Sequence, residues 1–238
     1  ARSLIATQFE PQVLQELNLE TLRPETVSFV DADLREKFSD LLFSVDLARH
    51  PRPRVRSAHV YVLFEHKSQT DPLTAFQLLS YIVRIGERRL REGLDLCPVY
   101  PLVIYHGEGA WTAARSFRDL LNVPTSLLAY QVDFRFKLLD LNQIKDEEIR
   151  GEPILQSTLG LLKYSRSVQL RDKLQGILKG FALAALQERL GQRQLEQWLE
   201  AIGSYMMAGN KGVDGQYYKQ TLASGFPTQF EPGSLADR

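Results

Sequence analysis

Three charged residues in the first third of the chain have types and spacings that suit metal-assisted hydrolysis. Glu65 and Lys67 lie two residues apart in the segment FEHKS, and Asp40 lies inside the apolar segment FSDLLFSV. Because successive side chains of a strand alternate between its faces, Glu65 and Lys67 point the same way if their segment is extended. An unpaired carboxylate at Asp40 would be costly among apolar neighbours, and a bound metal ion is one arrangement that keeps it charged.

These residue types predict a hydrolytic metal centre that acts on phosphodiesters. Two carboxylates and a backbone carbonyl are the hard oxygen ligands that Mg²⁺ or Mn²⁺ prefers. Such an ion polarises a phosphate and lowers the pKa of an attacking water, while a lysine orients that water or stabilises the developing charge. The prediction makes Asp40, Glu65 and Lys67 catalytic, with Asp40 and Glu65 as metal ligands. In the alternative, Asp40 caps or forms an ion pair locally, and Glu65 and Lys67 are an exposed pair at a strand end.

Two strands are expected to position the carboxylates. Residues 38–47 and 59–68 are nearly continuous runs of Val, Leu, Phe and Tyr, which is typical of strands covered on both faces. The intervening segment, ARHPRPRVRS, contains two prolines and four arginines and reads as an exposed loop. The two strands are therefore predicted to form a hairpin, with Asp40 and Glu65 on neighbouring strands.

A helix and a further strand are expected to follow the hairpin. Asp71 and Pro72 form a favourable helix start, and Gly93 is a suitable stop. Residues 98–107 are again a buried strand by composition, and a helical crossover places this strand parallel to the one that carries Glu65.

The remaining segments complete a mixed α/β chain. Apolar spacing predicts a short helix at 9–19, followed by a strand at 25–30, and alternation at 130–136 indicates a last strand. The domains are predicted as a core over 1–145, a helical extension over 146–208 and a poorly ordered tail over 209–238, in which YYKQTL can form a short helix. The helices of the extension are expected to pack on the core or on a second copy.

Composition limits the classes of protein that fit. The 29 basic and 29 acidic residues of the 238-residue chain cancel, so DNA contact would have to come from a local patch. The single cysteine, Cys97, cannot form an internal disulfide and suits a reducing compartment. No apolar run approaches the roughly 20 residues of a membrane span. The sequence thus predicts a cytoplasmic protein without a membrane partner.

Other polar residues are candidates for lining the site or binding phosphate. His106 and Tyr105 end a predicted parallel strand, where α/β sites gather, and the alternative for His106 is a packed side chain. Gln69 and Gln77 either touch the site or are solvated. Four arginines of the predicted hairpin loop either bind DNA phosphates or are simply solvated at the tip of the hairpin: Arg49, Arg52, Arg54 and Arg56.

Three blocks, in this order along the chain, resemble the recombination-promoting nuclease family, also called YhgA-like transposases. They are SFVDADLREKFSDLLFSV, then YVLFEHKSQ with the helix segment AFQLLSYIVRI, then PLVIYHG. The resemblance covers roughly residues 1–210. It implies a PD-(D/E)xK nuclease with a restriction-endonuclease-like fold, in the order α-β-β-β-α-β, and metal-dependent DNA cleavage of low sequence selectivity linked to recombination or mobile elements.

The same resemblance assigns roles to the three residues and shows two departures. Asp40 matches the metal-binding aspartate, Glu65 the second carboxylate and Lys67 the last motif position, where many members have glutamine. Members usually begin with a His-Asp…Phe-Lys helix that does not occur here after Ala1. If that segment supplies a ligand or completes the fold, this chain would have reduced activity or none.

Two alternatives to a nuclease stay open at this point. One is a non-catalytic DNA-binding or assembly protein on the same fold. The other is a transposase, although no segment reads as a helix-turn-helix that would bind transposon ends. A homodimer through the C-terminal helices is expected if both DNA strands are cut.

Overall fold

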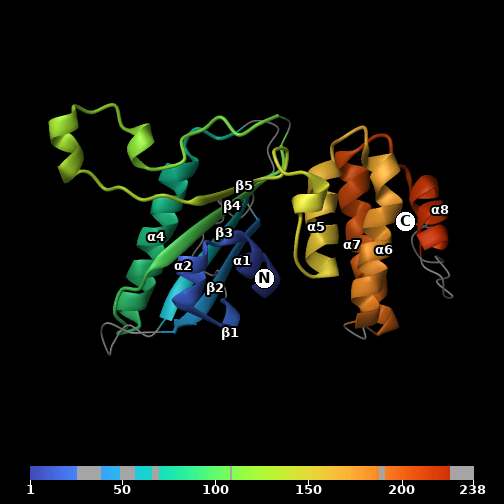
Figure 1. Cartoon of the computed structure of the whole chain (residues 1–238), viewed down its shortest axis with the longest axis horizontal. Coiled ribbons are helices and arrows are strands. Elements are labelled where there is room, and N and C mark those ends of the chain that lie inside the picture. Colours follow the sequence, from blue (N-terminus) through green and yellow to red (C-terminus); the bar gives the residue numbers. More distant parts are fainter. Residues whose placement is uncertain (26–38, 49–56, 66–69, 108, 188–190, 226–238) are drawn as a thin grey trace. The chain divides into compact units, whose positions relative to one another are not determined.

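A computed structural model describes residues 1–25, 39–48, 57–65, 70–107, 109–187 and 191–225, and for 39, 40, 57–65, 192 and 225 it describes the backbone alone. These residues divide into two compact units, Ala1–Gln143 and Ile144–Arg238. The first unit is mixed α/β, and the second unit is helical (Figure 1).

The first unit is built around one five-stranded sheet. Its helices are α1 (Arg2–Gln8), α2 (Pro11–Gln15) and α4 (Thr74–Arg91), with short 3₁₀ turns η1 (Arg118–Leu120) and η2 (Thr125–Tyr130). Its strands are β1 (Leu17–Glu25), β2 (Ser39–Leu47), β3 (Ser57–Glu65), β4 (Val99–Tyr105) and β5 (Lys137–Asp140). The strands lie in sequence order across the sheet.

The pairing of the strands confirms the expected hairpin and crossover. β2 runs antiparallel to both β1 and β3, whereas β4 runs parallel to β3 and β5 runs parallel to β4. The helix α4 links β3 to β4, as a parallel connection requires. The coarse expectation of a mixed sheet flanked by helices is thus confirmed.

Helices cover both faces of the sheet (Figure 1). On one face, Leu42 and Tyr105 share a buried cluster with Leu78 and Tyr81 of α4. On the other, Phe9 stacks on Tyr100 of β4, with ring centroids 4.1 Å apart. Because residues an odd number apart on a strand face opposite sides, Tyr100 and Tyr105 mark the two faces.

Two expected boundaries are wrong, and a third falls almost entirely outside the described residues. The predicted helix at 9–19 ends at Gln15, and residues from Leu17 onward are strand β1. Leu17 satisfies the alternation of a strand as well as helical spacing, and pairing with β2 decides between the two structures. The strand expected at 25–30 lies outside the described residues after 25. The alternation at 130–136 forms no named strand, since β5 begins at Lys137 and Arg135 makes only an isolated bridge to Ser116.

The helix α4 starts later than expected and stops where expected. Asp71 and Pro72 precede it: the Asp71 carbonyl accepts the Thr74 N–H at 3.1 Å and closes a turn. At the other end Gly93 has φ of 72°, and the Leu94 N–H donates to the Arg89 carbonyl at 2.8 Å. A left-handed glycine with this bond satisfies the last carbonyls of a helix.

A hydrogen-bonded carboxylate ties α2 to the sheet. Glu10 accepts bonds from Lys137 Nζ at 2.7 Å and from the Tyr100 hydroxyl at 2.5 Å. The bond from Lys137, followed by that from Tyr100, lowers the pKa of Glu10 from 4.5 to about 2. Burial and the bond to Glu10 raise the pKa of the Tyr100 hydroxyl.

This carboxylate predicts a pH-dependent stability of the first unit. Because the folded-state pKa of Glu10 is depressed, its contribution is present above pH 4.5 and is lost as the pH falls toward 2. The Glu10 side chain is 44% exposed, so screening limits the contribution to about 1 kcal/mol. Glu10→Gln should lower the free energy of unfolding by that amount at pH 7 and not at pH 2, as measured by urea denaturation. Equal differences at both pH values would contradict the assignment.

The second unit is helical, as its apolar stripes predict. Its elements are η3 (Asp146–Glu148), α5 (Pro153–Tyr164), α6 (Leu170–Gln187), α7 (Gln192–Gly209) and α8 (Gly215–Gly225). The short helix expected at YYKQTL is present as α8, where Tyr218 and Leu222 are buried against the other helices, so residues 215–225 of the tail expected to be poorly ordered are helical. Asp214 caps α8 by accepting the Tyr217 N–H at 2.7 Å. Residues 226–238 lie outside the described part.

Within the described residues, every helix is too short or too polar to span a bilayer.

Candidate active site

Two of the three predicted catalytic residues lie on adjacent strands. Asp40 is the second residue of β2 and Glu65 is the last residue of β3. The structure describes their backbones and not their side chains. Lys67, Gln69 and the four loop arginines (Arg49, Arg52, Arg54, Arg56) lie outside the described residues.

The register brings the two carboxylate positions close together. Asp40 pairs with Leu63, which is two residues before Glu65 on β3. The Cα atoms of such diagonal neighbours on antiparallel strands are about 7–8 Å apart, which is close enough for carboxylates at the two positions to share one ion. Since β2 runs opposite to β3, its first residues lie beside the last residues of β3. We call this region, with the last residues of β4 and β5, the carboxyl end of the sheet.

The same row of the sheet continues into β4 and β5. Glu65 pairs with Tyr105, and Tyr105 pairs with Asp140. Tyr105 is almost completely buried, and its ring makes an edge contact with Trp111 at 5.3 Å between centroids. His106 follows directly and is only 3% exposed. Both residues thus lie at the carboxyl end of the sheet, as the sequence suggested, in buried positions.

Asp140 organises the loop that follows β4. Its carboxylate accepts the Trp111 N–H at 2.9 Å and the Asn142 N–H at 3.0 Å. The Asn142 side chain donates in turn to the carbonyls of Gly107 and Gly109, at 3.0 and 2.9 Å. The end of β5 therefore holds Gly107, Gly109 and Trp111, in the first part of the loop, at the carboxyl end of the sheet.

Removal of this carboxylate should destabilise the first unit. Asp140 is 7% exposed, and Asp140→Ala would leave the buried Trp111 N–H without an acceptor, at a cost of about 2–3 kcal/mol. Urea unfolding followed by Trp111 fluorescence in a Trp198→Phe background measures this unit. The exposed control Asp119→Ala should cost under about 0.5 kcal/mol. Equal effects of both substitutions would show that the Asp140 bonds contribute nothing.

The start of α4 is tied to this region by two further contacts. The hydroxyls of Thr70 and Thr112 are hydrogen-bonded at 2.7 Å, which joins the segment after β3 to the loop after β4. Asp71 accepts the Leu73 N–H and the Gln77 amide, each at 2.9 Å. The amide oxygen of Gln77 is buried and accepts no hydrogen bond from the described residues. Gln77, a predicted lining residue, is thus held against the turn that precedes its helix.

A hard cation at the carboxyl end of the sheet is still expected to depend on Asp40 and Glu65, as the sequence predicts. Among the side chains that the structure describes, no three His, Cys, Asp or Glu residues group as metal ligands. The oxygens of Asp140 and Asp71 already accept protein N–H groups. Carboxylates at positions 40 and 65 would supply the oxygen ligands that Mg²⁺ or Mn²⁺ prefers.

Sequence reasoning missed the residues that build this region. Asp140, Asn142 and Trp111 received no role, although Asp140 ends an apolar run in the segment KLLDLN. A polar residue at the carboxyl end of a parallel strand is a usable signal. This signal can be used only if β5 is located correctly. The alternation at 130–136 instead placed the expected strand before Lys137, where β5 begins.

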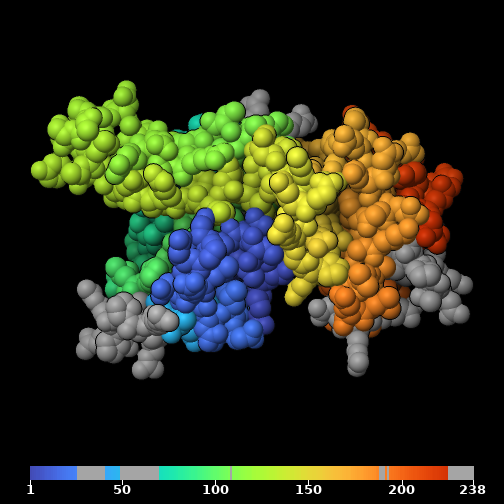
Figure 2. Space-filling view, viewed as in Figure 1, coloured from blue at the N-terminus to red at the C-terminus, as the bar shows by residue number. Residues whose placement is uncertain are grey.

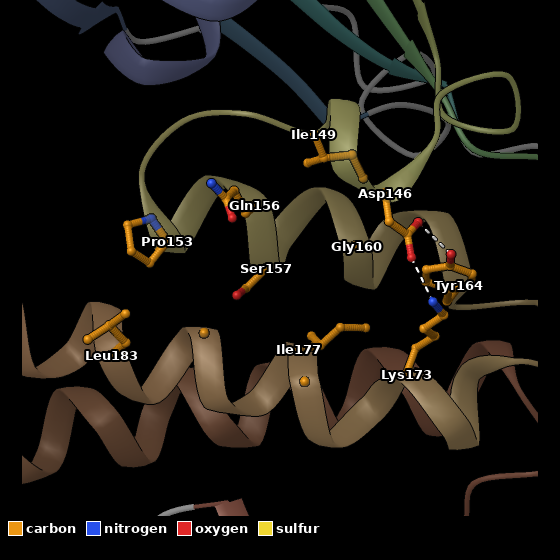
Figure 3. A pocket seen from close by; sticks show the side chains of 12 residues that line it. Asp146, Ile149, Pro153, Gln156, Ser157, Gly160, Tyr164, Lys173, Ile177 and Leu183 are labelled. Carbon is orange, nitrogen blue, oxygen red and sulfur yellow. Dashed lines mark hydrogen bonds and ion pairs between the residues drawn. The ribbon is translucent and has the colours of Figure 1, made fainter.

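A separate cavity lies between α5 and α6 of the second unit (Figure 3). Its volume is about 340 Å³, and Asp146 lies at its polar end. Asp146 accepts bonds from Lys163 at 2.7 Å, from Lys173 at 2.8 Å and from the Tyr164 hydroxyl at 2.6 Å. Burial raises the pKa of Asp146, but these bonds outweigh it and hold the pKa well below its usual value. Both carboxylate oxygens are occupied, so the network stabilises the packing of η3, α5 and α6.

A comparison with protein families matches residues 1–192 to the family described as "Putative transposase, YhgA-like". The chain belongs to the YhgA-like family. This agrees with the resemblance carried by the three sequence blocks. A comparison with solved structures found no match.

Curated relatives in the YhgA-like family are named as nucleases, with exceptions. The recombination-promoting nuclease RpnA of Escherichia coli K12 is 32% identical over 152 residues, which cover 63% of this chain and 49% of RpnA. RpnD of Escherichia coli O157:H7 is 29% identical over 81% of this chain and 71% of RpnD. The K12 protein RpnE, 34% identical over 58% of this chain and 45% of RpnE, is named an inactive nuclease-like protein. The chain therefore spans about half the length of RpnA and RpnE.

Proposed function

We propose that this chain is a metal-dependent DNA endonuclease that hydrolyses phosphodiester bonds with little sequence selectivity. The observation that carries the proposal is the register that sets Asp40 and Glu65 diagonally across β2 and β3. The nuclease names of relatives such as RpnA and RpnD support it. The mixed sheet, with α4 between β3 and β4, is consistent with a restriction-endonuclease-like core of the PD-(D/E)xK type.

In this proposal, different residues of the chain bind the metal, act on the attacking water and contact the DNA. Asp40 and Glu65 would hold Mg²⁺ or Mn²⁺, which when bound polarises the phosphate and lowers the pKa of the attacking water. Lys67, two residues beyond Glu65, orients that water or stabilises the charge that develops on the phosphate. The arginines of the loop after β2 would contact DNA phosphates, and Tyr105, His106, Gln69 and Gln77 would line the site.

Two features described above would keep the region in place during the reaction. The Thr70–Thr112 contact fixes the segment that follows Lys67 to the loop after β4. Asp140 fixes that loop to β5. Groups held by hydrogen bonds from rigid elements lose less energy to reorganisation when a substrate binds.

A second candidate is a DNA-binding protein on the same fold that does not cleave. It is favoured by one observation, namely that the relative RpnE of Escherichia coli K12 is named an inactive nuclease-like protein. The two candidates differ in their products and not in their binding, so a binding assay alone does not separate them.

Incubation with supercoiled plasmid tests the proposal. The chain should convert plasmid to nicked or linear forms in Mg²⁺ or Mn²⁺ and should leave it intact in EDTA. A parallel gel-shift assay in Ca²⁺ measures DNA binding without cleavage. Binding without cleavage in any metal would select the non-catalytic candidate, and neither binding nor cleavage would contradict both.

A further inference from the structure

Residues 121–132, here called the arm, form an exposed and uncharged excursion from the first unit. The sequence LNVPTSLLAYQV contains no acidic or basic residue. Leu127, Tyr130 and Val132 are 47%, 84% and 56% exposed, and no residue of η2 is buried. The arm is the yellow-green excursion beyond α4 in Figure 1, and Figure 2 shows it as a projection of the surface. Exposed apolar side chains gathered in this way mark interaction sites.

The base of the arm is held firmly, although most residues of its tip are exposed. The Phe117 N–H donates to the Phe134 carbonyl at 3.0 Å, and the two rings stack with centroids 6.0 Å apart. Arg118 pairs with Asp133 at 3.1 Å. The tip is therefore presented in a defined position, and docking it would require little further ordering.

A second exposed apolar surface runs along one side of α4. Leu73, Phe76, Val83 and Leu90, here called the α4 stripe, are 56%, 54%, 50% and 58% exposed. Their spacings of three and seven residues place them on one side of the helix. The arm base, through Phe117 and Phe134, packs on the cluster that includes the buried side of α4. The arm and the α4 stripe therefore flank the same face of the sheet.

We propose that the arm of one copy of this chain docks on the α4 stripe of a second copy, and reciprocally, in a two-fold dimer. In a two-fold interface, the arm of the first copy contacts the α4 stripe of the second, and the arm of the second contacts the α4 stripe of the first. Both apolar surfaces of each copy are therefore covered in one dimer. The arm has no lysine or arginine with which to neutralise phosphates, which disfavours DNA as its occupant. This interface differs from the one expected through the C-terminal helices.

The exposed area is sufficient for a stable dimer. A fully exposed aromatic side chain offers about 150–250 Å², so Tyr130 and Phe76 together expose on the order of 300 Å². With the aliphatic residues of the arm and the α4 stripe, each copy presents on the order of 800 Å², which is the share of one partner in a standard interface.

Sedimentation equilibrium of the whole chain, without DNA or metal, tests the dimer independently of the nuclease proposal. The parent chain should be dimeric at micromolar concentrations. Tyr130→Ser on the arm and Phe76→Ser on the α4 stripe should each raise the dissociation constant at least about 30-fold, as loss of a central aromatic does. Val168→Ser, which changes a 95% exposed residue of the second unit, should leave the constant unchanged.

A mixing experiment tests which surface meets which. A dimer of one Tyr130→Ser copy with one Phe76→Ser copy keeps one intact arm on one intact α4 stripe. The mixture should therefore associate more tightly than either variant alone. A monomeric parent at about 100 µM, dimers that survive both substitutions, or a mixture no tighter than its components would overturn the proposal. Loss of DNA binding by Tyr130→Ser with no change in mass would overturn it in favour of a DNA contact.

Discussion

Asp40→Asn should lower Mg²⁺-dependent plasmid cleavage by at least about 10³-fold. The substitution keeps the size of the side chain and removes the charge that would hold the ion. A loss of that size corresponds to roughly 4 kcal/mol of transition-state stabilisation, which is the scale expected for a metal ligand. Initial rates of plasmid nicking at saturating Mg²⁺ measure the effect.

A matched control lies on the same strand. Asp46 is near the opposite end of β2 and pairs with Ser57 at the far end of β3. Positions 40 and 46 belong to the same face by the alternation of a strand, so Asp46→Asn tests charge and strand context without touching the carboxyl end of the sheet. Equal losses in both variants would mean that the effect comes from folding and not from the site.

Lys67→Gln should lower cleavage by about 10²-fold and leave metal affinity unchanged. Glutamine can still donate a hydrogen bond, but it carries no charge to stabilise the phosphate as negative charge develops. Single-turnover cleavage across a Mg²⁺ titration separates the two effects. The rate at saturation should fall, and the Mg²⁺ concentration at half-maximal rate should not move.

The control for this lysine is Lys179→Gln, an exposed residue of α6 in the second unit. It should cleave at the parent rate. If Lys67→Gln instead shifted the Mg²⁺ requirement at an unchanged maximal rate, the lysine would act on the metal site and not on the phosphate.

The hairpin and the crossover could be predicted from sequence because their signals agree. The apolar runs that became β2 and β3 flank a segment with two prolines, and α4 lies between β3 and β4 with Gly93 at its end. Strand composition and loop chemistry therefore pointed to the same arrangement. The mixed α/β class followed from that agreement.

The register could not be predicted in the same way. Side chains on a strand repeat every two residues, so an apolar run fits its neighbour in several registers that differ by two. The row that joins Glu65, Tyr105 and Asp140 depends on a choice among these registers. The proximity of positions 40 and 65 depends on the same choice for β2.

Segments with weak or ambiguous periodicity account for the wrong boundaries. Leu17 fits both the helical spacing of residues 9–17 and the alternation of β1, and only pairing with β2 resolves it. The helix α8 extends beyond the short helix expected at YYKQTL, and burial of Tyr218 and Leu222 stabilises it. Residues 121–129 of the arm have no periodic pattern, so the exposure of the arm's apolar side chains is seen only in the structure.

The most direct test of the central claim is whether Asp40 and Glu65 form one metal site. Binding of Mn²⁺, followed by electron paramagnetic resonance of the free ion with a short DNA duplex present, measures this without relying on cleavage. The account predicts binding by the parent chain and by Asp46→Asn, and its loss in both Asp40→Asn and Glu65→Gln. Unchanged Mn²⁺ binding in either of those two variants would contradict it.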